Sequence, residues 1–436
     1  MNTNELLQRW STMSLTDIED QIIRGEDQET VAQLIGADTI AEIRGISFAA
    51  PPSAERENVI LLPGIMGSLL SSIRGVTSLL WINPLLFLQG NGRYLRLNAD
   101  GDDDETPEVD CVPIGLEKMT YLKISLQFNR QTHLHEFPYD WRRPIEYNAD
   151  ILKTSIERWS NGHPERQFTL VAHSMGGLVS RTYMARHPQH AARHVKRLIM
   201  HGTPNFGATN AIENLVNGNS MMATVDKLNS NNEMRKLVYC LPSVYQLLPT
   251  PPEYFPPGIE YPVDFDLYDA RSWRMQDIQQ KYLDGARSLH QTLAQSDPQI
   301  PMHVIAGGNI ATMIAARLAF NQDVPELQMT TIDKGTNSGD GTVPLWSAEL
   351  PGAKVHYIQE VHRALSGNNR VIRASMDLIH SGTCSLPETL PPPKLISFDA
   401  EAEAPLPPTI QAEVLQHKIE TGTASETDLN SLYFAF

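Results

Sequence analysis

A serine at a tight turn between a strand-like run and a helix-like run is the feature that most constrains this chain. The apolar segment 168–172 leads to Ser174, and the segment 178–185 has the residue types of a helix. Such a turn brings backbone segments almost into contact, so the positions two before and two after the serine need very small side chains. Those positions hold Ala172 and Gly176. The pattern predicts a strand, a turn and a helix, with the serine hydroxyl projecting above the end of a sheet.

Strand-like and helix-like segments alternate through most of the chain. This alternation predicts an α/β fold, a mostly parallel sheet with helices on both faces. The expected strands are 58–63, 133–137, 168–172, 197–201, 302–306 and 354–359. The helix after Ser174 should end near His187, because Pro188 cannot continue it.

We expect the chain to have three parts. The parts are a helical N-terminal extension (1–50), an α/β domain (51–385) with insertions near 70–125 and 205–300, and a Pro-rich linker with a C-terminal helical tail (386–436). In the N-terminal extension, Gly25 and Gly36 should end short helices. Insertions at the carboxyl ends of strands are where lids and binding surfaces lie on open α/β sheets.

The composition narrows the classes of partner and compartment. The formal net charge of −16 argues against binding to nucleic acid and against broad attraction to anionic membranes. Three cysteines lie far apart in no metal-binding or disulfide pattern, which favours a reducing compartment. We see no signal peptide and no stretch apolar enough to span a bilayer. We therefore expect a cytoplasmic protein with no metal and no cofactor; export without a cleaved signal stays open.

A serine hydroxyl is a weak nucleophile unless a base takes its proton and an acid orients that base. His362 is the expected base, because it follows the predicted strand 354–359. Asp340 is the expected acid, since it lies between two glycines and 22 residues before His362 (362 − 340). Together with Ser174 these residues form the predicted catalytic triad.

Other residues compete for these roles. Asp333 is the alternative to Asp340 as the acid. His356 falls inside a predicted strand and is expected to be structural. His173 precedes the serine, and the turn should point its side chain away from the serine hydroxyl. We expect it to pack or to form a hydrogen bond rather than to act as the base.

Acyl transfer also needs N–H donors aimed at the oxyanion that develops during attack. The backbone N–H of Met175, directly after the nucleophile, is the first expected donor. The second should come from the loop 63–68 after the first strand, where glycines let the backbone approach a substrate. We assign it to Ile65, with Met66 as the alternative.

Two further segments are conspicuous in composition. The aromatic and charged run 137–143 is expected to be structural, with Asp140 paired to an arginine. The acidic run 100–105 lacks the glycine and the closing glutamate of an EF-hand, so we interpret it as a solvated surface loop rather than a calcium site.

Taken together, several segments resemble the lecithin:cholesterol acyltransferase family, which includes the lysosomal phospholipases. The matching segments are 62–68, 80–83, 138–142, 172–177, 201–204, 339–344 and His362. The resemblance implies an α/β-hydrolase fold with cap or lid insertions and acyl-ester chemistry on lipids. It implies the triad and the oxyanion donors given above, and an apolar insertion around Trp81 that faces lipid. We take Trp81, Leu85 and Phe87 as the lid or lipid-facing candidates within 76–88.

The resemblance has limits. The disulfides of the secreted members have no counterpart, and Ala172 replaces the usual glycine. The first 50 residues and the tail beyond residue 385 lie outside the match. The family resemblance therefore leaves open which lipid is cut and whether water or an alcohol accepts the acyl group.

The function that these observations favour is a serine acyl-ester hydrolase of the lipase or phospholipase A type, with an acyl-enzyme on Ser174. The alternative is an acyltransferase, esterase or thioesterase that acts on a non-membrane substrate. A third hypothesis is a non-catalytic interaction protein on a hydrolase scaffold. The expected partners are a lipid or other acyl ester, a membrane surface touched peripherally, and a protein bound through the terminal helices.

Overall fold

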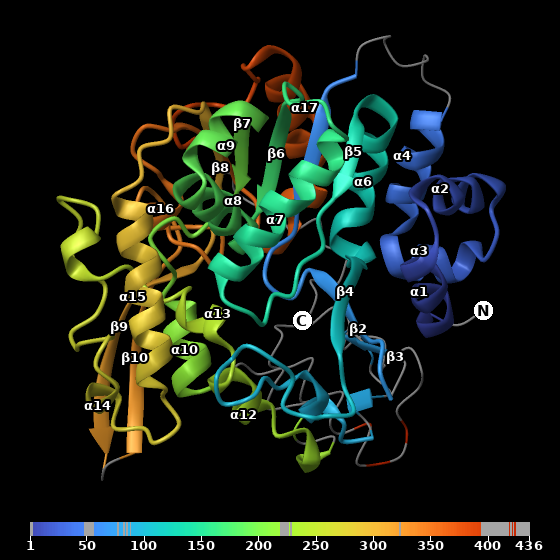
Figure 1. Cartoon of the computed structure of the whole chain (residues 1–436). Coiled ribbons are helices and arrows are strands. Elements are labelled where there is room, and N and C mark those ends of the chain that lie inside the picture. Colours follow the sequence, from blue (N-terminus) through green and yellow to red (C-terminus); the bar gives the residue numbers. More distant parts are fainter. Residues whose placement is uncertain are drawn as a thin grey trace.

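The structure of the chain is a computed structural model. A sheet lies at the centre of the molecule (Figure 1). The structure describes residues 3–47, 56–75, 78–81, 83, 86–87, 89–218, 226, 229–321, 324–393, 418, 421 and 423. Apart from residues 418, 421 and 423, the predicted C-terminal helical tail lies outside these residues, as does part of the Pro-rich linker.

Six parallel strands form the central sheet, in the order β11-β8-β7-β6-β1-β5. They are β1 (Asn58–Leu62), β5 (His133–Glu136), β6 (Phe168–His173), β7 (Val195–His201), β8 (Met302–Gly307) and β11 (Lys354–Ile358). All six strands expected from the sequence are confirmed, within a few residues at their ends. The nucleophile strand β6 lies inside the sheet, between β7 and β1.

Helices cover both faces of this sheet and give it two hydrophobic cores. Along β1, Val59 and Leu61 point into one core, and Ile60 and Leu62 point into the other. The first core is closed by α6 (Lys118–Gln131) and α17 (Asn369–Ser381). The second is closed by α7 (Ile145–Ser160), α8 (Met175–Arg186) and α15 (Gln280–Ala294). Burial on both faces explains why the inner strands β1 and β6 are apolar runs without alternation, whereas the edge strands β5 and β11 contain polar residues.

Four short helices precede the sheet. They are α1 (Thr3–Thr12), α2 (Leu15–Arg24), α3 (Gln28–Ile35) and α4 (Ala37–Ser47). The predicted stops are confirmed, since Gly25 and Gly36 cap the ends of α2 and α3. This group packs on α6, where ion pairs join Glu42 to Lys123 and Glu19 to Arg130.

The first insertion contains a small antiparallel sheet that the sequence did not predict. Its strands β2 (Ser68–Ser72), β3 (Ser78–Trp81) and β4 (Cys111–Leu116) pair in the order β3-β2-β4. The turn helix η1 (Gly92–Leu95) lies between β3 and β4. The sheet connects the end of β1 to the start of α6.

The second insertion consists mainly of short helices. They are α10 (Asn210–Val216), η2 (Ser230–Asn232), α12 (Met234–Tyr239), α13 (Pro242–Tyr245), η3 (Pro252–Tyr254) and α14 (Ala270–Trp273). Three short helices complete the domain: α9 (Pro188–His194), α16 (Leu345–Ala348) and η4 (His362–Gly367).

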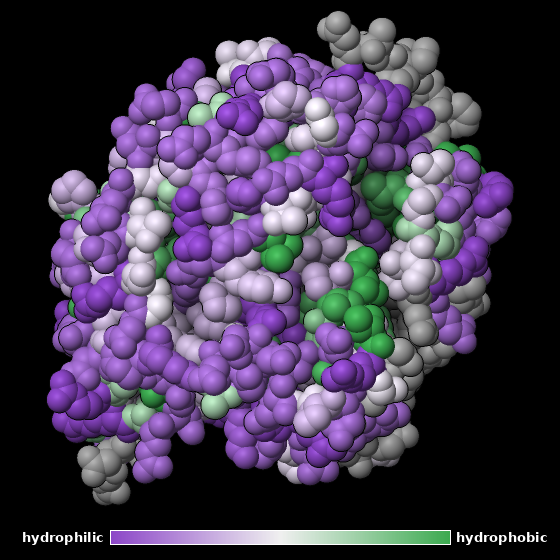
Figure 2. Space-filling view, viewed as in Figure 1, coloured by the Kyte–Doolittle hydropathy of each residue, from purple (hydrophilic) through white to green (hydrophobic). Residues whose placement is uncertain are grey.

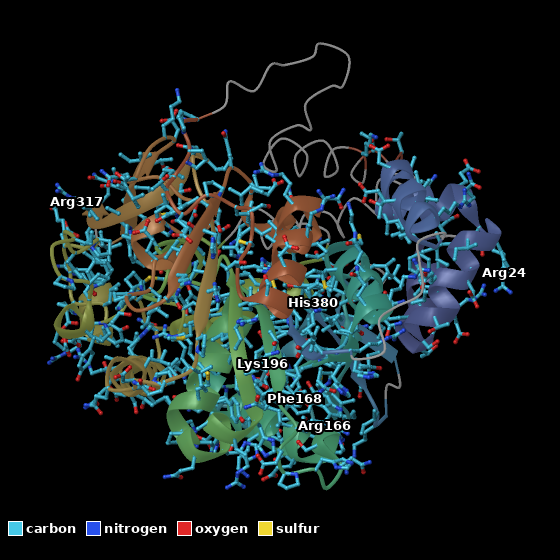
Figure 3. All side chains as sticks on the ribbon, turned by 90° about the horizontal axis from the view of Figure 1, so that it is seen from above. Arg24, Arg166, Phe168, Lys196, Arg317 and His380 are labelled. Carbon is cyan, nitrogen blue, oxygen red and sulfur yellow. The ribbon has the colours of Figure 1, made fainter. Side chains whose placement is uncertain are left out.

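A long hairpin, β9 (Thr312–Asn321) and β10 (Val324–Ile332), extends from the domain and was also not expected. Arg24 on α2 and Arg317 on β9 lie at opposite sides of the molecule (Figure 3). Among the described residues, no helix is both long and apolar enough to cross a membrane.

Candidate active site

The turn at Ser174 joins β6 to α8 in a backbone conformation that only close packing sustains. Ser174 has φ 53°, which is uncommon for a residue with a side chain. A side chain at Gly176 would come within 2.5 Å of the Pro63 carbonyl oxygen, and one at Gly177 would collide with Thr203. Ala172 is completely buried in the same strand. The small residues anticipated from the sequence are therefore a steric requirement of this turn.

Hydrogen bonds link the three predicted triad residues. The Ser174 Oγ lies 2.9 Å from His362 Nε2, and His362 Nδ1 lies 2.7 Å from Asp340 Oδ2. Ser174 and Asp340 are buried, and 13% of the His362 side chain is exposed. Residues that are 188 and 22 positions apart in the chain thus meet at the carboxyl ends of the strands.

The loop around Asp340 holds its carboxylate in one orientation. Its second oxygen, Oδ1, accepts hydrogen bonds from the backbone N–H groups of Thr342 and Val343, at 3.0 and 2.7 Å. The His362 N–H donates to the Asp340 carbonyl at 2.8 Å. A side chain at Gly307 would come within 2.5 Å of the Asp340 Cβ. One carboxylate oxygen is therefore left to face the imidazole.

The competing residues lie elsewhere. Asp333 is 68% exposed beside Lys334. His356 is buried and stacks on His303, and burial lowers its pKa. His173, in contrast, lies beside the triad, with its ring 4.9 Å from that of His362, and its two nitrogens bond to the Tyr121 hydroxyl and the His362 carbonyl.

The predicted oxyanion donors lie on the two sides of the serine. Ile65 lines the cavity that opens at Ser174, and Met175 directly follows the serine at the start of α8. Among the described residues, the N–H groups of Ile65 and Met175 take part in no backbone hydrogen bond. Gly64 lets this loop approach the nucleophile, since a side chain there would lie 2.9 Å from the Ser174 Cβ. Met66 has φ 62° and its carbonyl accepts a hydrogen bond from Trp81.

The cavity at Ser174 has a volume of about 320 Å³ and is mostly apolar. Its apolar side chains come from the first two insertions and from the oxyanion loop: Ile65, Met66, Trp81, Ala208, Ala211, Leu237, Val238, Leu241, Val244 and Leu247. Glu117 and Arg363 lie on the same wall as polar residues. Among the described residues, no group of three or more His, Cys, Asp or Glu side chains is arranged to hold a metal ion.

The expected exposure of the apolar insertion is corrected by the structure. Trp81 is 1% exposed, lines the cavity, and contacts Trp141 and Phe87 edge to face. Phe87 is completely buried behind it. Neither side chain lies on the outer surface, because aromatic packing and the Trp81 Nε1–H bond to Met66 hold the segment inward. Leu85 lies outside the described residues.

Side chains of the run 137–142 form hydrogen bonds with the backbone of the oxyanion loop 63–68. The Tyr139 hydroxyl donates to the Pro63 carbonyl at 2.8 Å, and the Trp141 Nε1–H donates to the Ser68 carbonyl at 3.2 Å. The expected ion pair is present, since Arg142 forms two hydrogen bonds with Asp140, at 2.9 and 2.8 Å.

Arg142 also changes the interpretation of the acidic loop. Its Nη1 lies 2.7 Å from Asp104, whose side chain is only 7% exposed. Asp104 therefore anchors the first insertion to the core and is not a solvated residue, whereas Asp100 is 82% exposed. Cys111 is close by, and burial raises the pKa of its thiol to about 12.

Tyr121 is a site residue that sequence reasoning missed. It lies on α6, is almost fully buried, and bonds to both Gly64 and His173. A tyrosine on an amphipathic helix carries no local signal of such a position, because its partners are 52 and 57 residues away.

A comparison with protein-family profiles matches residues 117–376 to the family described as lecithin:cholesterol acyltransferase. The match covers more than half of the 436 residues. The chain belongs to the lecithin:cholesterol acyltransferase family. Its fold is the α/β-hydrolase fold, with the nucleophile turn after β6 and the histidine after the edge strand β11.

Similar curated proteins include two from Arabidopsis thaliana. "Lecithin-cholesterol acyltransferase-like 4" is 23% identical over 398 residues, which cover 72% of this chain and 74% of that protein. "Phospholipase A(1) LCAT3" is 26% identical over 138 residues, which cover 30% of this chain and 31% of that protein. The chain therefore aligns with about a third of one relative and about three quarters of the other.

Solved structures with similar coordinates are more distant. A Tle4–Tli4 complex has a TM-score of 0.47 and 13% identity, over 73% of this chain and 97% of that chain. The mature lipase BlEst2 of Bacillus licheniformis has a TM-score of 0.41 and 14% identity, over 76% of this chain and 95% of that chain.

Proposed function

We propose that this chain is a serine hydrolase that cleaves acyl esters of lipids through an acyl-enzyme on Ser174. The observation that carries the proposal is the hydrogen-bonded series Ser174, His362 and Asp340, which opens into a mostly apolar cavity. A nucleophile, a base and an orienting acid in this geometry are the parts that ester attack requires.

The reaction follows from the positions of the donors and acceptors. His362 Nε2 takes the proton of the Ser174 hydroxyl as its oxygen attacks the ester carbonyl carbon. The N–H groups of Ile65 and Met175 would stabilise the negative charge on the carbonyl oxygen. The leaving alcohol departs with the proton from His362. Water then attacks the acyl-enzyme with His362 as base again, which releases the fatty acid and restores the Ser174 hydroxyl.

The cavity supports a substrate with a long acyl chain. Leu237, Leu241 and Leu247 line the cavity together with Trp81. Burial of apolar surface stabilises a complex by about 25 cal/mol per Å², so each methylene that enters the cavity adds to binding.

Exposed apolar side chains close in sequence to residues of the cavity wall support contact with a lipid surface. In Figure 2 most of the visible face is hydrophilic, and hydrophobic side chains gather over β4. Ile114 on β4 is 36% exposed and lies three residues before Glu117 of the cavity wall. Val361 is 45% exposed and directly precedes His362. These two side chains take the place of Trp81 and Phe87 as the proposed lipid-facing residues.

The test is mass spectrometry of mixed phospholipid vesicles incubated with the wild-type chain and with Ser174→Ala. The proposal expects free fatty acid and lysolipid with the wild type alone, and the lysolipid identifies which ester is cut. If no lipid is turned over while p-nitrophenyl esters are still cleaved in a Ser174-dependent way, the substrate is a soluble ester. Equal release by both proteins would overturn the role of Ser174.

A further inference from the structure

A series of buried hydrogen bonds connects the oxyanion loop to the residue that carries the proposed base, without passing through the Ser174 hydroxyl. Gly64 N–H donates to the Tyr121 hydroxyl at 2.8 Å, and the Tyr121 oxygen lies 2.7 Å from His173 Nδ1. His173 Nε2 lies 3.1 Å from the backbone carbonyl oxygen of His362. Both side chains are almost fully buried.

The groups at the two ends of this hydrogen-bond series, the Gly64 N–H and the His362 carbonyl, determine where each proton of the series lies. The His362 carbonyl can only accept, so His173 must carry its proton on Nε2. The Gly64 N–H can only donate, so the Tyr121 oxygen accepts there and its own proton is directed to His173 Nδ1. One neutral tautomer of His173 satisfies all three bonds.

The surroundings favour that neutral form. Burial, and then the nearby charges of His362, His201 and Arg363, hold the pKa of His173 well below its ordinary value. Burial raises the pKa of Tyr121 above its ordinary value, and the charge of Glu117 adds to this effect. The direction of the hydrogen bonds is therefore preserved over the whole neutral pH range.

We propose that Tyr121 and His173 are positioning residues that set the distance between the oxyanion loop and the base. The proposal rests on the proposed function of Ser174. Gly64 precedes the expected donor Ile65, and the His362 carbonyl belongs to the residue that moves the proton. The two groups must lie on opposite sides of one reacting carbon, and errors of about 1 Å in such a placement cost about a hundredfold in rate.

The kinetic test uses a soluble p-nitrophenyl ester, so that membrane binding does not enter. Tyr121→Phe removes one hydroxyl and leaves the ring in place. It should lower kcat about 10- to 100-fold while KM changes by less than about twofold, since Tyr121 lines the cavity but its ring stays in place and the apolar side chains of the cavity are unaltered. Unchanged kcat in Tyr121→Phe would overturn the proposal.

Tyr183→Phe is the matched control. Tyr183 on α8 is another buried tyrosine, and its hydroxyl lies 2.8 Å from the Nδ1 atom of His190 on α9. Its removal deletes the same type of bond without touching Gly64 or His362. The control should retain the kcat of the wild type, and a loss equal to that of Tyr121→Phe would mean that the effect is one of general stability.

Two substitutions of His173 separate positioning from packing. Gln can still donate to the His362 carbonyl, whereas Phe keeps the ring shape and loses both bonds. The proposal expects His173→Gln to retain more kcat than His173→Phe. A purely packing role predicts the reverse order.

A measurement that needs no turnover keeps this inference separate from the proposed function. In the full-length Ser174→Ala protein labelled with ¹⁵N-histidine, NMR reports the tautomer of each imidazole. His173 should stay neutral, with its proton on Nε2, from pH 5 to pH 9. A proton on Nδ1, or titration near pH 6.5, would refute the hydrogen-bond chain even if the enzyme proves active. Conversely, hydrolysis that does not depend on Ser174 would refute the proposed function, and the ¹⁵N NMR spectrum of His173 would still test the series of hydrogen bonds.

Discussion

Two buried aspartates near the oxyanion loop perform different work. Asp340 is 1% exposed and pairs with an imidazole, and Asp140 is 6% exposed and pairs with a guanidinium. The side chains of Asp340 and His362 share one 2.7 Å hydrogen bond, and His362 lines the cavity. The Asp140–Arg142 pair has two bonds and is closed over by Asp104.

The difference lies in whether the partner can change its charge. An imidazole gains and loses a proton near neutral pH, so a carboxylate beside it can stabilise a charge that comes and goes. A guanidinium stays charged at any accessible pH, so its carboxylate can only hold structure. The first pair should matter for rate and the second for stability, and substitutions can separate the two effects.

The largest expected effect is on turnover at the first pair. Asp340→Asn should lower kcat on a soluble ester by about 10⁴, because the amide favours the wrong tautomer of His362. The midpoint of urea unfolding should move little, since the amide keeps one acceptor for the Thr342 and Val343 N–H groups. If the rate were unimpaired, the acid role would pass to Asp333.

The second pair should show the opposite pattern. Asp140→Asn leaves the buried Arg142 with Asp104 as its remaining carboxylate, which should cost about 3 kcal/mol of unfolding free energy. Urea unfolding measures this loss. Ester hydrolysis per folded molecule, counted by active-site titration at low temperature, should stay within about threefold of wild type. If Asp140→Asn lowered this rate a thousandfold and left the unfolding free energy unchanged, the Asp140–Arg142 pair would serve catalysis rather than stability.

His201 is a buried histidine that should affect how the stability of the protein depends on pH. His201 is fully buried between Ser366 and Ser375, and burial lowers its pKa to about 3. The unfolded chain binds this proton near pH 6.5 and the folded chain does not, so the stability that His201 contributes is lost as pH falls below about 6.5. Between pH 7.5 and pH 5, wild type should lose about 2 kcal/mol more unfolding free energy than His201→Asn. Equal losses in both proteins would show that His201 titrates normally.

The smallest expected effect concerns the surface rather than either pair. Ile114→Glu should lower turnover of phospholipid vesicles about tenfold and leave a soluble ester unaffected, because a charge at this position opposes contact with a lipid surface. Ile151→Glu is the control, since Ile151 on α7 is 40% exposed and does not line the cavity. Equal losses of turnover on vesicles and on the soluble ester would mean that Ile114 is needed for the folded structure and does not contact a lipid surface.

The sequence predicted the parts of the molecule that have local signals. Strand-like segments between helix-like ones marked all six strands of the parallel sheet, and small residues around Ser174 marked its turn. The order of Ser174, Asp340 and His362 along the chain was enough to choose three side chains that the structure brings within hydrogen-bonding distance.

Other features depend on contacts that no short pattern encodes. The hairpin β9–β10 was missed because its alanine- and leucine-containing sequence has no clear alternation, and its strands are stabilised by pairing with each other. The burial of Trp81 depends on Trp141, sixty residues further along (141 − 81). Asp104 was expected in solvent because its acidic neighbours dominate the local composition, whereas its partner Arg142 follows a different strand.

The position of β11 at the edge of the sheet also bears on when the chain becomes active during its synthesis. The nucleophile, the oxyanion loop and five of the six parallel strands precede residue 308, whereas the base follows β11, which pairs only with β8. A nascent chain that ends before His362 therefore carries Ser174 without its proposed proton acceptor. On the proposed mechanism, a ribosome can expose most of this fold beside a membrane before any ester there can be cut.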